Sequence, residues 1–265
     1  MYSYCFNLHE HRNHNQSIHK YNNMRKARLT ILTLLAINTF LLNNVIAQKS
    51  NDSLLVKKCN DFNITGKGNN AEWGKTEWNR MTKLDTGGQN YESKFKILYS
   101  STGIYVLLNG KDNKITTKFD QDFQNLYEGD VFEVFFHTNP QLPLYLEYEI
   151  NQLNKELVLI IPHLKGSIYG WIPWHYEKER QMKKMVDITG GKMEANATIN
   201  SWSAELFFPY KLFNPLENVP PKSGSVWNAN FYRLDYDSGK MMKWSWAPVK
   251  NSFHEFEKFG SIKFE

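Results

Sequence analysis

The chain has 265 residues, which is enough for one large β-domain or two small ones. Its formal charge of +5 is concentrated at the start, because residues 1–47 hold five Lys/Arg and one acid, so 27 basic and 26 acidic residues remain. No basic run with interleaved aromatic residues follows, which excludes a nucleic-acid partner.

Residues 24–47 have the layout of an export signal. Residues 24–28 form a positive n-region, residues 29–42 are apolar but short for a membrane span, and Ala47 supplies the small residue that signal peptidase requires. Cleavage near Ala47 predicts a secreted or periplasmic protein with no membrane span; a retained membrane anchor is the alternative. Residues 1–23 are interpreted as an extension ahead of a true start at Met24.

The two cysteines exclude an internal disulfide after cleavage. Cys5 precedes the predicted cleavage point, so the mature chain would hold one thiol, Cys59. Cys59 is interpreted as a small buried hydrophobic residue rather than a catalytic thiol, because "VKKCNDF" gives little support for an activated setting.

From residue 53 to residue 265, alternating apolar and polar residues predict one all-β domain. Short strands between Gly, Pro, Asn and Asp clusters indicate an antiparallel β-sandwich of two sheets, jelly-roll-like, with few short helices. Strands are expected over 93–101, 104–112, 130–138, 144–152, 156–162, 192–200, 202–209, 225–236, 242–248 and 260–265. Helical turns are expected within 72–81 and 210–215, and the charged segment 175–186 is expected to be a solvated loop or short helix.

The sequence also predicts two strand pairings and three tryptophans in the core. The first two strands are expected to form a hairpin turning at Thr102-Gly103, and strands 192–200 and 202–209 are expected to pair across Ser201. The indoles assigned to the core are those of Trp73, Trp202 and Trp227.

Three glutamates interrupt the apolar rows of two expected strands: Glu133 in "DVFEVFFHT", and Glu147 and Glu149 in "LYLEYEINQ". An unpaired buried charge is costly. These side chains must therefore face water, pair with Lys or Arg, or meet a polar ligand. Glu133 with Glu147 or Glu149 could also act as acid and base in the hydrolysis of an O-glycosyl bond. That enzymatic alternative remains open, although no G-x-S-x-G, H-E-x-x-H or phosphate-binding loop is present.

Aromatic residues beside polar ones suggest a carbohydrate site. A sugar offers apolar faces that stack on aromatic rings and hydroxyl groups that a carboxylate can accept. Tyr127, Phe253, Trp171 and Trp174 stand in such surroundings; packing in the core or in a loop is the alternative for each.

Seven ordered blocks resemble carbohydrate-binding module family 9 and the wider DOMON-like sandwich superfamily. They cover nearly all of the expected mature chain: Asn70 to Trp78, Ile97 to Asp112, Tyr127 to Pro140, Tyr145 to Asn154, Trp202 to Phe213, Trp227 to Tyr236 and Phe253 to Glu265. The resemblance implies a non-catalytic module that binds xylan- or cellulose-type glycans. With no room for an attached hydrolase in this chain, it would assist separate polysaccharide-degrading enzymes.

The resemblance also implies site residues. Members attached to xylanases clamp the end of a sugar chain between two Trp, and those positions fall on Tyr127 and Phe253. The sugar-binding glutamate of the family falls on Glu133. Glu149 stands where those members have arginine, and Lys250 falls near their asparagine, so Lys250 is expected to supply the cation that Glu149 does not.

Two cofactors enter as weaker expectations. The Asp-rich loop 119–125 could hold a structural Ca²⁺ through oxygen ligands, although it lacks EF-hand spacing. Related sandwiches hold haem, which needs axial ligands. The histidines present, none in a defensible pair, are His137, His163, His175 and His254.

Overall fold

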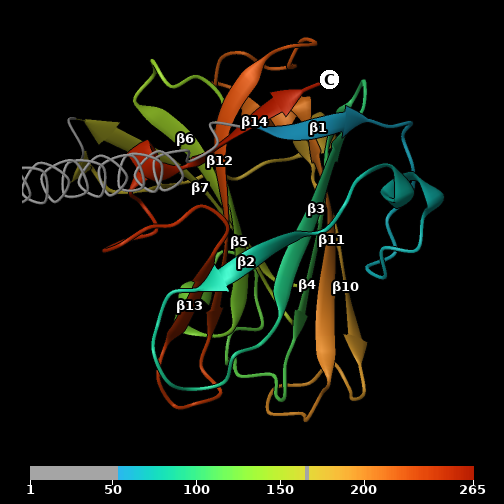
Figure 1. Ribbon diagram of the computed structural model, residues 1–265, viewed down its shortest axis with the longest axis vertical. Coiled ribbons are helices and arrows are strands. Elements are labelled where there is room, and N and C mark those ends of the chain that lie inside the picture. Colours follow the sequence, from blue (N-terminus) through green and yellow to red (C-terminus); the bar gives the residue numbers. More distant parts are fainter. Residues whose placement is uncertain (1–52, 165–166) are drawn as a thin grey trace, which may run out of the picture. The chain divides into compact units, whose positions relative to one another are not determined.

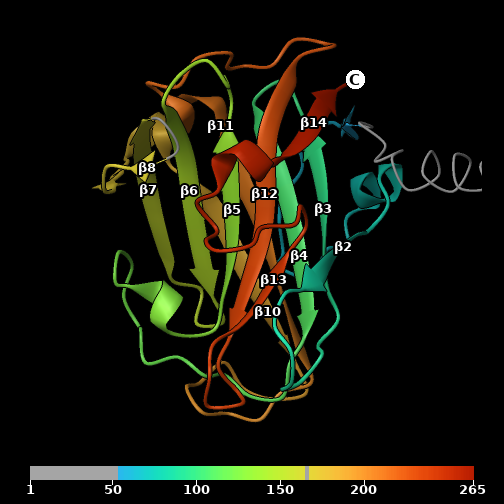
Figure 2. The same cartoon turned by 60° about the vertical axis from the view of Figure 1, so that its left-hand side comes forward.

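The computed structural model describes residues 53–164 and 167–265, so the predicted signal segment and Cys5 lie outside the described residues. The expected sandwich is confirmed: two β-sheets face each other (Figures 1 and 2). The β5 sheet runs in the order β14 (Gly260–Phe264), β12 (Val226–Asp235), β5 (Val131–His137), β6 (Leu144–Asn151) and β7 (Glu156–Leu164). The β4 sheet runs in the order β10 (Lys183–Thr189), β11 (Ser201–Pro209), β4 (Gly103–Lys111) and β3 (Ser93–Tyr99).

Short strands join the two sheets at their edges. β1 (Leu54–Lys58) pairs in parallel with β14 on one side and β3 on the other. β2 (Asn79–Lys83) pairs with β3 and with β13 (Met242–Ser245), which lies beside β12. β8 (Ser167–Ile168) and β9 (Ile172–Pro173) flank β7. The helical turns are η1 (Ala71–Lys75), η2 (Leu126–Glu128), η3 (Lys178–Arg180), η4 (Tyr210–Phe213) and η5 (Phe256–Lys258).

The main core fills the space between the sheets, as the two-residue alternation of the strands requires. On β5, Phe132, Val134 and Phe136 point into it. Trp202 and Trp227 are fully buried there, and Trp73 is buried in a smaller cluster with Cys59, so the three core indoles are confirmed. Burial raises the pKa of the Cys59 thiol to about 12, which fits the inert role expected for it.

The prediction of a strand over residues 192–200, just before Ser201, is wrong. Residues 192–200 form no strand; the partner of β11 is β10, which lies within and just after the segment expected to be a charged loop. Gly190 and Asn196 have positive φ angles, and a Cβ on Gly191 would lie 2.1 Å from the Thr198 carbonyl oxygen, so this segment bends instead of extending. The consecutive lysines Lys183 and Lys184 of β10 suit an edge strand.

A second apolar cluster covers the outer face of the β5 sheet. It contains Val131, Phe135, Tyr145, Leu157, Tyr232 and Phe259, among others. The segment carrying η5, red in Figure 2, crosses this face in front of β5 and β12. The sheet is therefore apolar on both faces, and its outer face is covered by the 249–259 segment rather than by a helix layer. Within the described residues, no helix is long and apolar enough to cross a membrane.

Candidate functional site

A cavity of about 450 Å³ opens between the outer face of the β5 sheet and the 249–259 segment. This volume lies in the range of small-molecule sites. Six of the seven predicted ligand residues line it: Tyr127, Glu133, Glu149, Trp171, Lys250 and Phe253. Residues more than 120 positions apart in the sequence thus meet at one place, and we call this cavity the β5 pocket.

Strand register sets the three glutamates side by side in the β5 pocket. Glu133 on β5 lies directly opposite Glu149 on β6, and Glu147 lies two residues before Glu149 on the same face. Their other cross-strand neighbours are apolar or aromatic: Tyr232 faces Glu133, Leu157 faces Glu149 and Leu159 faces Glu147. Like charges in opposite positions destabilise a sheet, so this arrangement needs a local reason.

All three carboxyl groups are almost inaccessible. The exposed fraction is 3% for Glu133, 5% for Glu147 and 1% for Glu149. Burial raises the pKa of Glu147 to about 8 and raises the pKa of Glu133 well above its usual value, with the charge of Glu147 adding to the second shift. The pKa of Glu149 is also raised, first by burial and then by the charges of its two neighbours. Burial therefore favours the protonated form of all three carboxyl groups.

The glutamates have no cationic partner of the kind expected from the sequence. Lys250 lies in the wall of the β5 pocket, but it makes none of the ion pairs found within residues 53–164 and 167–265. The basic group nearest to a glutamate is His254, whose Nδ1 lies 3.8 Å from Oε2 of Glu147. Burial lowers the pKa of His254, and its Nδ1 lies 2.7 Å from the Tyr145 hydroxyl, as suits a neutral ring. Among the described residues, the glutamates are therefore neither solvated nor paired with Lys or Arg, whereas the expectation that Lys250 supplies a cation to the site stays a prediction.

Aromatic rings form the walls around the carboxyl groups. Tyr127 lies in η2 and is 39% exposed, and its carbonyl accepts a hydrogen bond of 2.7 Å from the Tyr236 hydroxyl. Phe253 is half-buried and stacks on Tyr232, with ring centroids 4.0 Å apart and planes at 13°. Trp171, in the loop before β9, is 61% exposed. These rings offer flat apolar faces beside acidic groups.

Hydrogen bonds fix the segment that closes the β5 pocket. The Glu255 carboxylate accepts from the backbone N–H groups of Lys250 and Asn251, at 2.8 and 3.0 Å. The Tyr232 hydroxyl donates to the Phe253 carbonyl over 2.8 Å. The ring of Phe253 is thus positioned by the sheet beneath it and by the turn around it.

Sequence reasoning missed several residues of the β5 pocket and misplaced one. The missed polar residues are Asn125, Lys243, Asn251, Ser252 and His254. Three of them adjoin Phe253 in "KNSFH", so proximity to that aromatic was the available signal. The placement of Trp174 beside Trp171 is wrong: Trp174 packs on the main core, and its Nε1 donates to the Leu212 carbonyl at 2.8 Å. Trp171 and Trp174 flank β9 three positions apart, and in extended chain an odd separation places side chains on opposite faces, which separates the two indoles.

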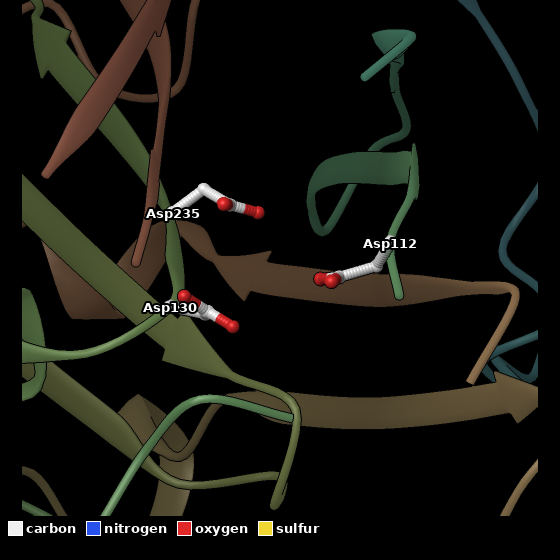
Figure 3. Close-up of side chains that lie close together, drawn as sticks. All are labelled: Asp112, Asp130 and Asp235. Carbon is white, nitrogen blue, oxygen red and sulfur yellow. The ribbon is translucent and has the colours of Figure 1, made fainter. Parts of the chain in front are cut away.

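A second acidic cluster lies apart from the β5 pocket. Carboxylate oxygens of Asp112, Asp130 and Asp235 approach within 4.8 Å of one another (Figure 3). Arg233 Nη2 bonds to Oδ2 of both Asp112 and Asp235, at 3.0 and 2.6 Å. The Gln152 amide nitrogen bonds to Asp112 and Asp130, at 3.2 and 3.0 Å. The protein's own donors therefore satisfy the oxygens that a metal ion would need.

The loop expected to hold calcium is organised differently. Asp122 Oδ1 accepts hydrogen bonds from the Glu156 N–H at 2.9 Å and from Lys184 Nζ at 2.6 Å. Within the part of the chain that the structure describes, the aspartate cluster around Arg233 is the one group of acids close enough to share an ion, and it includes no residue of 119–125. A calcium ion in this loop stays a prediction.

The predicted family resemblance is confirmed over part of the chain. Residues 64–159 match the family model described as "Carbohydrate family 9 binding domain-like". This stretch includes Tyr127, Glu133, Glu147 and Glu149, whereas Trp171, Lys250 and Phe253 lie beyond it. No curated protein matches the chain.

Solved structures of carbohydrate-binding proteins have the same fold. One is a protein from Bacteroides uniformis ATCC 8492 proposed to bind carbohydrate, with a TM-score of 0.66 and 18% identity over 81% of this chain and 99% of that chain. Two others are structures of a family 9 carbohydrate-binding module from Caldicellulosiruptor kristjanssonii, in complex with glucose and with cellotriose. Each has a TM-score of 0.57 and 15% identity, and each match covers 81% of this chain. The match covers 96% of the chain in the glucose complex and 94% of the chain in the cellotriose complex.

Proposed function

We propose that this chain is an exported, non-catalytic carbohydrate-binding module that uses the β5 pocket to hold xylan- or cellulose-type glycans. The observation that carries the proposal is the joining of flat aromatic rings and acidic groups in one cavity of about 450 Å³. The family 9 match and the sugar complexes of the structural neighbours support the same ligand class.

The chemistry of the walls suits a pyranose ring. Tyr127 and Phe253 provide apolar faces for the C–H side of a sugar, with Trp171 as a third exposed ring. Glu133 would receive hydroxyl groups, the role that the family resemblance gives to this position. Because the site is small and open to one side, we expect dissociation constants in the micromolar to millimolar range. Binding of this strength would let the module assist separate polysaccharide-degrading enzymes without trapping them.

The glycosidase alternative needs two carboxyl groups in different protonation states, one acid and one ionised base or nucleophile. In the β5 pocket, burial raises the pKa of all three glutamates, so none is favoured as the ionised partner. This argues for binding rather than hydrolysis. Release of reducing sugar from xylan or cellulose, lost in Glu133→Gln, would support the enzyme instead.

Calorimetric titration with cellotriose and xylotriose tests the proposal. Wild-type protein should bind at least one of them, and Tyr127→Ala should weaken binding by about tenfold through loss of a stacking face. Glu133→Ala should weaken it further by removing both carboxyl oxygens that could meet sugar hydroxyl groups. Tyr169→Ala is the matched control, because Tyr169 is 69% exposed but lies outside the β5 pocket. Absence of binding across a broad glycan panel, or equal losses in Tyr169→Ala, would contradict the proposal.

A further inference from the structure

A neutral sugar does not account for three buried glutamates in the β5 pocket. One carboxylate can accept bonds from two neighbouring hydroxyl groups, yet three carboxyl groups are grouped here. Both oxygens of Glu149 and one oxygen of Glu147 are buried without a hydrogen-bond partner among the described residues. Buried polar groups are almost always satisfied, so these atoms point to a ligand that brings positive charge or several donors.

The protein does not supply that positive charge itself. Burial lowers the pKa of His254, which favours its neutral form, and its Nδ1 lies 2.7 Å from the Tyr145 hydroxyl. Lys243 also lines the β5 pocket, but its Nζ lies 3.8 Å from Oδ1 of Asp85. Lys250 is exposed and makes no ion pair within the described part of the chain. Among the described residues, no cation neutralises Glu133, Glu147 and Glu149, so a ligand would have to supply the positive charge.

The spacing of the glutamates favours an organic cation over a metal ion. Among the described residues, only Asp112, Asp130 and Asp235 have ligand atoms close enough together to share one ion, and the three glutamates do not form such a group. A protonated amine needs only one or two carboxylates for its three donors. It also gains from aromatic faces, which Tyr127, Trp171 and Phe253 provide around the glutamates.

We propose that the preferred ligand of the β5 pocket is a saccharide carrying a protonated amine, such as a β-linked glucosamine oligomer. This inference rests on the proposed carbohydrate-binding function and specifies its ligand class. The amine would meet Glu149 and Glu133, the rings would hold the sugar face, and polar groups of the 249–259 segment would meet the remaining hydroxyls.

Protonation provides an independent signature of this ligand. In the free protein, burial raises the pKa of the glutamates and so favours their protonated form. A bound ammonium group stabilises the carboxylate form, so its entry should release a proton to solvent. A neutral sugar should bind with no such release. The groups whose titration bears on this signal are Glu133, Glu147, Glu149, His254, Tyr127, Tyr145, Tyr232, Lys243 and Lys250.

Three trisaccharides with the same backbone test the inference: the β-1,4 trimers of glucosamine, N-acetylglucosamine and glucose. They differ only in the amine, acetamide or hydroxyl at one carbon of each ring. Calorimetry at about pH 7, in buffers of different ionisation enthalpy, measures affinity and proton release together. We expect the glucosamine trimer to bind about tenfold more tightly than either analogue and to be the only one that releases protons.

Two variants define the contribution of the glutamates. Glu149→Gln should reduce the preference for the glucosamine trimer to less than about threefold and abolish proton release. Glu133→Gln provides a second test should the first variant fold poorly, as checked by circular dichroism. Glu194→Gln is the control, because Glu194 is exposed and lies outside the β5 pocket.

The outcomes separate this inference from the proposed function. Equal or tighter binding of the glucose trimer, or a preference unchanged in Glu149→Gln, would overturn the amine preference while leaving carbohydrate binding intact. Failure of all three trimers and of a broad glycan panel would overturn both. Binding of simple alkylammonium ions as tightly as the trimer would show a cation site without sugar recognition and would also overturn the inference.

Discussion

Replacing Glu147 with Gln should stabilise the folded protein at alkaline pH and have little effect in acid. Glu147 is 5% exposed, and burial raises the pKa of its carboxyl group from 4.5 to about 8. The folded state therefore holds this proton more tightly than the unfolded state. The resulting stabilisation is complete below about pH 4.5 and is lost as the pH rises to about 8.

The size of the effect follows from that pKa change. Each pKa unit corresponds to about 1.4 kcal/mol, so the interval from 4.5 to about 8 gives an upper limit of about 5 kcal/mol in the free energy of unfolding. Hydration of an ionised group that lines an open cavity would reduce this value. We therefore expect Glu147→Gln to be more stable than wild type by about 2–5 kcal/mol at a pH near 9.

Urea denaturation of wild type and variant at several pH values between about 4 and 9 measures this difference. The wild-type free energy of unfolding should fall more steeply with rising pH than that of Glu147→Gln. Glu194→Gln should follow the wild-type curve, because Glu194 is exposed. Parallel curves for wild type and Glu147→Gln would refute the assignment of a buried, protonated glutamate.

Other predictions concern the core and the second acidic cluster. Arg233→Met should lower the free energy of unfolding by about 3–5 kcal/mol, seen in denaturant titrations, because it leaves Asp112 and Asp235 without their buried cation. Chelation with EDTA should lower the melting temperature only through a calcium ion in loop 119–125, because Arg233 and Gln152 already satisfy the clustered aspartates; a fall that persists in Asp122→Asn would indicate a metal elsewhere. Trp202→Ala should cost about 3–5 kcal/mol by opening a cavity in the core. In a thiol-reagent assay at about pH 8, Cys59 should react only after unfolding, since its pKa is about 12.

The sequence predicted the fold well because burial between two sheets imposes a strict two-residue period. The alternation of Phe132, Val134 and Phe136 marked β5 without help from any tertiary contact. β10 was missed because it is an edge strand with a single buried residue, Val186, and its charged pattern resembles that of a loop. Tertiary pairing with β11, rather than local propensity, decides its conformation.

Most residues that line the β5 pocket could be predicted from the sequence, but the burial and raised pKa values of its glutamates could not. The family resemblance brought Tyr127, Glu133 and Phe253 together, and the structure places them around one cavity. The mutual burial of the glutamates depends on the cover that the 249–259 segment gives to the outer face, which no strand pattern encodes. The expectation that Lys250 supplies the cation that Glu149 does not stays a prediction: Lys250 lines the β5 pocket and makes no ion pair among the described residues.

The pairing of β1 with both β3 and β14 has a consequence for how the chain acquires its structure. Leu54 meets Ile262 across the parallel ladder, a separation of more than 200 residues. Until the last strand has been synthesised, β1 retains an unpaired edge able to template intermolecular association. The sheet edge at β1 is thus covered only after β14 is available to pair with it.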